Sequence, residues 1–69
     1  MVYVFKTSVI YKHQIKIISL ELNSIQQIDK WNFDLTDCDK ILRVEAKNFD
    51  TEIICRLLKS LGYDCIELQ

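Results

Sequence analysis

The chain contains no proline and a single glycine, Gly62. These two residues usually mark turns, so element boundaries have to be inferred here from hydrophobic periodicity and from helix-capping residues. The chain also lacks a glycine-rich phosphate-binding loop, and its one histidine, His13, has no acidic residue or nucleophile suitably placed beside it in the sequence. We therefore expect a protein that is not an enzyme and that needs no cofactor.

Two further absences concern charge and long apolar runs. Nine basic and ten acidic residues give a net charge of -1, and the basic residues are scattered singly, whereas a nucleic-acid binder usually carries a basic stripe. No apolar run approaches the ~20 residues that span a bilayer. The first residues, MVYVFKTSVIYKH, alternate like a strand and do not resemble a signal peptide. We expect one soluble, cytoplasmic domain over residues 1–69.

The three cysteines, Cys38, Cys55 and Cys65, cannot all pair within one chain. Their spacings of 17 and 10 residues match neither a zinc finger nor a CxxC redox pair. Free thiols are typical of a reducing compartment. We interpret these cysteines as small hydrophobic residues without a chemical role.

Hydrophobic periodicity divides the chain into six elements. Strands are predicted at residues 2–8, 30–35, 40–46 and 63–68, and helices at residues 12–26 and from Asp50 or Thr51, either of which can act as the cap, to Leu61. The expected inward residues are Ile15, Ile18, Leu22, Ile25, Trp31, Phe33, Leu35, Leu42, Val44, Ala46, Ile54, Leu57, Leu58 and Leu61. Gly62 suits the position after the second helix, because it tolerates a positive φ.

The order β-α-β-β-α-β predicts an α/β (α+β) fold of the ferredoxin-like type. In this sandwich two helices cover one face of a four-stranded antiparallel sheet. The polar segment TDCD, with its neighbour Asp34, is interpreted as the hairpin turn between the middle strands, because aspartate side chains bond to nearby backbone.

The order of apolar residues resembles the heavy-metal-associated domain of copper chaperones and metal-pumping ATPases. That family's pattern is roughly GMxCxxC, then V, I, L and L at spacings of three, four and three, then GVxxVxVDL. Ile15, Ile18, Leu22 and Ile25 match the four apolar positions, and QIDKWNFDL, residues 27–35, matches the last segment. LLKSLGYDCIEL also resembles the family's last helix and strand, at Leu58, Gly62 and Tyr63.

In the same register the family's two metal-binding cysteines fall on Tyr11 and Gln14, and its buried methionine falls on Val9. The glycine before that methionine is replaced by Ser8. Monovalent copper prefers soft sulfur ligands, and neither a phenol nor an amide replaces them. The resemblance thus implies a relative with the scaffold but without the metal ligands, and no metal is expected.

One alternative is a metal-handling protein that uses His13 and Cys65 in place of the CxxC pair, since the end of the second helix is expected near the first loop. A single imidazole needs partners to form a site, however. Cys65 is expected two residues into the last strand, where its thiol could lie too far from the loop. Cys38 is expected at the opposite end of the sheet, where it cannot join them.

The same topology occurs in RNA-recognition domains, which stack bases on aromatic residues of the two central strands. The expected outward residues here are Val2, Val4, Lys6, Ile41, Arg43 and Glu45. None is aromatic, so we expect no nucleic-acid partner.

The remaining expectation is a contact surface. His13, Ile17, Leu20 and Ser24 lie opposite the buried side of the first helix, so two large aliphatic residues face solvent. They indicate self-association or an unknown protein partner, although isolated exposed apolar residues are common. The edge strand YDCIELQ is a second candidate surface, which Asp64 and Glu67 would discourage from pairing with another chain.

Overall fold

The computed structural model describes residues 1–68, and Gln69, at the end of the predicted edge segment, lies outside the described residues. Six elements follow one another in the predicted order. They are β1 (Val2–Thr7), α1 (Lys12–Asn23), β2 (Ile28–Asp34), β3 (Ile41–Ala46), α2 (Glu52–Ser60) and β4 (Cys65–Leu68).

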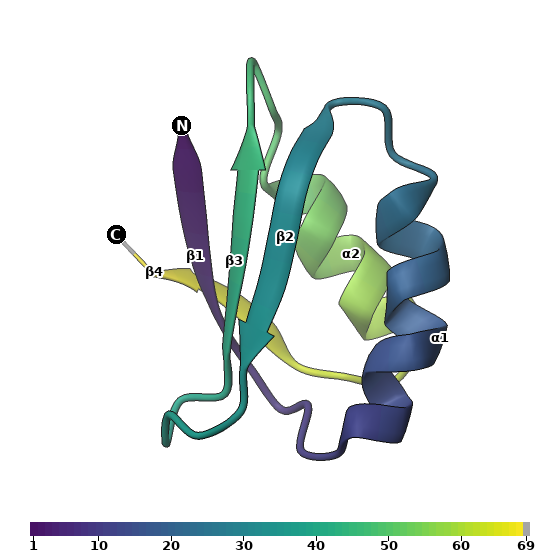
Figure 1. Cartoon of the computed structure of the whole chain (residues 1–69), viewed down its shortest axis with the longest axis vertical. Helices are drawn as coiled ribbons and strands as arrows, with labels where there is room; N and C mark the ends of the chain where they lie inside the picture. The colour runs from purple at the N-terminus through teal and green to yellow at the C-terminus, as the bar shows by residue number, and fades with distance from the viewer. Residues whose placement is uncertain (69) are drawn as a thin grey trace.

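The four strands form one antiparallel sheet in the order β2-β3-β1-β4, and both helices lie on the same side of it (Figure 1). β1 is a central strand. Its Phe5 pairs in register with Leu42 on β3 and with Glu67 on β4. This arrangement is the ferredoxin-like βαββαβ fold that the sequence predicts.

The core fills the space between the sheet and the helices. Its largest fully buried side chains come from one face of the sheet, from the stripes of both helices and from the loop after β1: Phe5, Val9, Ile18, Leu22, Leu42, Val44, Ile54 and Leu58. Around them pack half-buried residues that include Ile15, Ile25, Trp31 and Phe33. Burying apolar area of this kind is the main favourable contribution to folding.

The helix ends follow from local hydrogen bonds. Of the two predicted caps for α2, it is Asp50 whose Oδ1 accepts a hydrogen bond from the Glu52 N–H, at 3.0 Å. After α2, Gly62 has a φ of 93°, as its predicted role requires. α1 ends three residues before the predicted residue 26. There the Ser24 hydroxyl donates to the Glu21 carbonyl, at 2.7 Å, and so competes with continuation of the helix.

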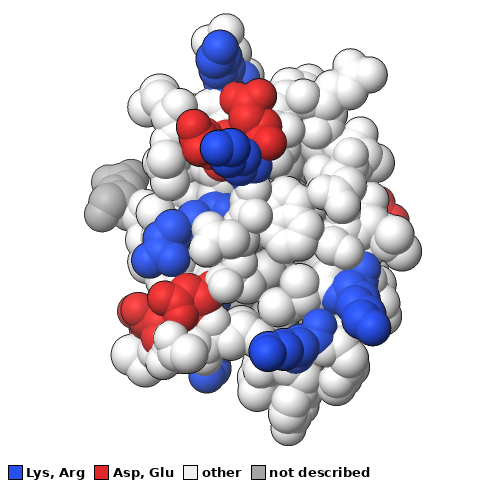
Figure 2. All heavy atoms as spheres, in the orientation of Figure 1, with Lys and Arg blue, Asp and Glu red and all other residues white. Residues whose placement is uncertain are grey.

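The open face of the sheet has two unlike halves, because cross-strand partners point to the same side. Its β1–β4 half is mainly apolar and its β2–β3 half is mainly charged. The residues concerned are Val2, Val4, Lys6, Ile66 and Leu68 in the first half, and Lys30, Asn32, Asp34, Ile41, Arg43 and Glu45 in the second. On the surface drawn in Figure 2, basic and acidic groups are interspersed and form no single basic stripe.

Ile41 corrects the prediction for this face, because it is only 5% exposed. It lies on β3 between Lys6 on β1 and Asp34 on β2, and these flanking side chains shield it from water. Among residues 1–68, no helix is long and apolar enough to cross a bilayer.

Candidate functional site

Three loops meet at one end of the sheet, which we call the loop end. They are the β1–α1 loop (residues 8–11), the β2–β3 hairpin (residues 35–40) and the α2–β4 connection (residues 61–64) (Figure 1). The hairpin belongs here because β2 runs parallel to β1, so both strands finish at the same end. The prediction that Cys38 lies at the opposite end is therefore wrong.

Hydrogen bonds tie the three loops together. The Ser8 N–H donates to the Asp64 carbonyl at 3.1 Å, and the Asp64 N–H donates to Ser8 Oγ at 2.8 Å. The Thr7 hydroxyl donates to the Lys40 carbonyl at 2.7 Å and accepts from the Val9 N–H at 3.2 Å. These bonds fix the β1–α1 loop against both of its neighbours.

The three positions matched to the family's metal loop differ in burial and in hydrogen bonding. Val9 is fully buried in the core, like the methionine it replaces in the resemblance. Tyr11 is the N-cap residue of α1 and is 57% exposed. Gln14 folds back over the helix start, where its Oε1 accepts from the N–H groups of Ile10 and Tyr11 at 2.9 and 3.0 Å.

The hydrogen bonds of the Gln14 side chain stabilise the start of the helix. A helix start has N–H groups without intrahelical partners, and a glutamine at the third helical position commonly bonds back to the cap residue. The amide oxygen that the resemblance places at a metal position is thus occupied by two hydrogen bonds.

Next to this loop lies an exposed apolar surface. The rings of Tyr11 and His13 stack with centroids 5.3 Å apart and an interplanar angle of 10°. Ile17 and Leu20 continue along the same side of α1 and are 56% and 73% exposed, as predicted. Ile10, at the start of the loop, is 54% exposed and was not predicted. We call these five residues the α1 surface.

Cys65 lies in quite different surroundings. It is the first residue of β4 and is 3% exposed. Burial raises the pKa of Cys65 to about 12, with Cys55 adding to the rise. His13 is exposed on α1 and stacks on Tyr11, so the two residues of the metal-binding alternative occupy unlike environments.

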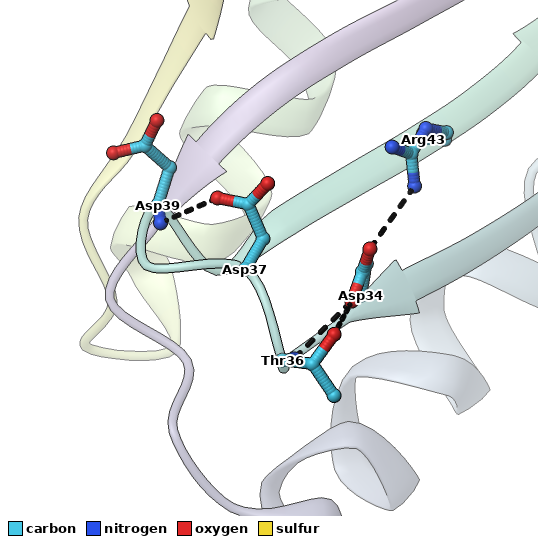
Figure 3. A network of polar contacts seen from close by, with 5 residues as sticks. All are labelled: Asp34, Thr36, Asp37, Asp39 and Arg43. Atoms are coloured by element: carbon cyan, nitrogen blue, oxygen red, sulfur yellow. Dashed lines mark hydrogen bonds and ion pairs between the residues drawn. The ribbon is translucent and has the colours of Figure 1, made fainter.

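Three acidic residues of the loop end, Asp34, Asp37 and Asp39, lie at the end of β2 and in the hairpin (Figure 3). Asp37, Cys38 and Asp39 offer ligand atoms within 4.8 Å of one another. However, Asp37 Oδ1 accepts from the Asp39 N–H at 2.8 Å, and Asp39 lies 3.5 Å from Lys6 Nζ. Asp34 likewise accepts from the N–H and hydroxyl of Thr36, at 3.2 and 2.6 Å. The carboxylates therefore form the turn, as the sequence analysis proposed.

Comparison of the chain with protein-family models, with curated proteins and with solved structures gives no match. The resemblance to the heavy-metal-associated domain therefore stays a prediction from the sequence.

The first prediction concerns Gln14. Replacing it with alanine leaves two N–H groups at the start of α1 without their acceptor, so Gln14→Ala should lower the free energy of unfolding by about 1 kcal/mol. Gln14→Glu keeps the acceptor and adds a negative charge at the helix start, and it should match the wild type at neutral pH. Urea unfolding followed by Trp31 fluorescence measures both, with exposed Gln27→Ala as control. Equal losses in the two alanine variants would contradict the assignment.

The second prediction concerns the pH dependence of the hairpin. The hydroxyl of Thr36, more than Arg43 at 3.9 Å, holds the pKa of Asp34 below its ordinary value of 3.8. Because the folded pKa is lowered, the stabilising effect is present at higher pH and is lost as the pH falls through that pKa. An NMR titration of the Asp34 carboxyl should show a larger rise in its pKa for Thr36→Val than for Arg43→Gln. The opposite order would assign the effect to the ion pair.

Proposed function

We propose that the chain is a non-catalytic protein-binding module that uses a heavy-metal-associated-like scaffold without its metal ligands. Its contact surface is the α1 surface, and its partner is a second copy of the chain or another protein. Three free thiols support a cytoplasmic location, since thiols persist in a reducing compartment.

One observation carries this proposal. Nine large apolar side chains are exposed among the described residues, and four of them, Ile10, Tyr11, Ile17 and Leu20, belong to one segment of eleven residues. Residues four and three apart on a helix are neighbours, so Ile17 adjoins His13, which stacks on Tyr11, and Leu20 adjoins Ile17. Clustered apolar residues mark interaction sites more often than scattered ones do.

Two observations favour a role without metal chemistry or catalysis. The Gln14 amide is committed to the backbone of the helix start, and the Tyr11 phenol is a hard oxygen donor. The histidine stacks on an aromatic ring, and the hairpin carboxylates accept backbone bonds. In the His13 and Cys65 alternative, an exposed imidazole and a buried thiol would have to reach one ion, so the geometry favours the protein-binding role.

The third prediction tests the contact surface. If the partner is a second copy, sedimentation should show a mass that rises with concentration, and Leu20→Glu should make the chain monomeric because a buried charge opposes the contact. Gln26→Glu, at an exposed position outside the α1 surface, is the matched control. An oligomer that survives Leu20→Glu and is lost with Ile66→Glu would move the contact to β4.

If the wild type is monomeric at every concentration, the partner is a different protein. A photo-crosslinking residue at position 20 should then give a defined adduct in the native cells, and the same residue at position 26 should give none. Equal labelling at both positions would contradict a contact at the α1 surface.

The fourth prediction tests whether cysteines at positions 11 and 14 would restore copper binding. Tyr11 and Gln14 flank the first turn of α1, and the Gln14 side chain reaches the backbone of Tyr11. The double substitution Tyr11→Cys with Gln14→Cys should therefore create a site that binds one monovalent copper ion per chain, unlike the parent. Both chains should carry Cys55→Ser, so that this partly exposed native thiol does not contribute. Competition with a chromophoric copper(I) chelator measures the affinity.

Its matched control shifts the pair by one position, to Ile10→Cys with His13→Cys, which keeps the spacing but leaves the matched register. Equal copper affinity in both double variants would contradict the register of the resemblance. A tight complex in the parent chain would contradict the proposed loss of metal binding.

A further inference from the structure

The outward side of α1 has the spacing of a helix that pairs with another helix. Four exposed residues recur there at intervals of four, three and four: His13, Ile17, Leu20 and Ser24. These intervals are those of the a and d positions of a heptad repeat, which form the seam between two packed helices. Ser24, the C-cap, still has helical backbone angles, with φ -82° and ψ -10°. We call these four residues the α1 seam, and it runs along the whole helix.

The centre of the α1 seam is aliphatic and its two ends are polar. Because the interval of three follows an a position, Ile17 occupies an a position and Leu20 a d position. Isoleucine at a with leucine at d favours pairs of helices over larger bundles. His13 and Ser24 lie at the ends of the seam, where a contact would meet water. A second helix with the same seam therefore brings aliphatic against aliphatic residues.

Two residues of opposite charge flank the α1 seam. Lys16 directly precedes Ile17 and Glu21 directly follows Leu20, which places them at the g and e positions of the heptad. Five residues turn a helix by about 140° beyond one full turn, so the two side chains lie on opposite flanks and do not meet within α1. Both residues are exposed, and within residues 1–68 neither takes part in an ion pair.

These charges distinguish the two directions in which two copies of α1 can pair. If the helices run parallel about a two-fold axis, the Lys16 flank of each copy faces the Glu21 flank of the other, and the axis repeats this contact. A g residue and the e residue five positions later are the ones that meet in a parallel pair. If the helices run antiparallel, each flank faces the same flank of the partner, so lysine and glutamate stay apart. Charge complementarity thus favours the parallel pair.

We propose that α1 pairs in parallel with α1 of a second copy of the chain, with Ile17 and Leu20 at the two-fold axis and Lys16 of each copy against Glu21 of the other. This inference rests on the proposed function and names the partner of the α1 surface. A helix of 12 residues offers about three turns, which is little for a specific interface. The dimer should therefore be weak, with a dissociation constant of about 10 μM to 1 mM.

Exchanging the two charges tests the pairing. Lys16→Glu and Glu21→Lys each place like charges at both contacts, so either variant alone should weaken dimerisation about fivefold or more at low salt and much less at high salt. An equimolar mixture of the two variants should dimerise as strongly as the wild type, because every contact again joins a lysine and a glutamate. Sedimentation equilibrium up to about 1 mM chain measures the dimer. Lys47→Glu makes the same charge change at an exposed position outside α1 and is the matched control.

Cross-linking tests the direction of the helices. In chains with Cys38→Ser and Cys55→Ser, one variant carries His13→Cys and another carries Ser24→Cys, at opposite ends of the α1 seam. In the parallel dimer each new thiol lies beside the same thiol of the partner, so oxidation of a mixture should give symmetric disulfides. A mixture that gives mainly disulfides between positions 13 and 24 would show antiparallel packing and overturn the proposal.

Three results separate the parallel dimer from the wider proposal that the α1 surface binds a protein. A wild type that stays monomeric up to about 1 mM overturns the dimer, while a defined photo-crosslink at position 20 would still support a different partner there. A dimer that is lost with Leu20→Glu but is not restored by mixing the two charge variants overturns the parallel direction and keeps the surface. A dimer that ignores Leu20→Glu, together with equal photo-crosslinking at positions 20 and 26, overturns both.

Discussion

The pairing of β1 with two neighbours is the constraint on which the rest of the structure depends. β1 bonds to β3 on one side and to β4 on the other, so the first strand of the chain lies between segments that come much later. Phe5 occupies the middle of this arrangement and is fully buried beneath the helices. Because β1 finishes where β3 and β4 begin, the three loops meet at one end, and the candidate site is a direct result of this pairing.

The loop end shows how one backbone arrangement can serve different chemistry. Tyr11 and Gln14, where the resemblance places two thiolates, are the cap residue and the third residue of the first turn of α1. Gln14 uses this position to satisfy the N–H groups of the helix start, while Tyr11 extends outward and stacks on His13. The same positions thus help to hold the loop and to form an apolar surface.

Much of the fold could be predicted from local patterns. The apolar spacing identified the stripes of both helices, and their centres, Ile18 and Ile54, are fully buried. Gly62 marked the end of α2 because a positive φ there needs a residue without a side chain. The exposure of Ile17 and Leu20 followed from the same periodicity, because a helix that buries one side exposes the other.

What could not be predicted depends on contacts between distant segments. Cys38 was placed at the wrong end because a turn's position depends on the direction of the strand before it. Ile41 is shielded by side chains of two neighbouring strands, which a period of two does not reveal. The role of Gln14 could have been found, because a glutamine three residues after a cap position is a known local signal.

The position of β4 has a consequence for how the protein is made. β1 is synthesised before both of its neighbours, and β4, residues 65–68, is the later of the two. Until then β1 has an unpaired edge beside the side chain of Phe5, and an exposed edge of this kind invites pairing with other chains. The complete sheet can therefore close only after translation has passed β4, and a nascent chain stalled before it would be prone to aggregate.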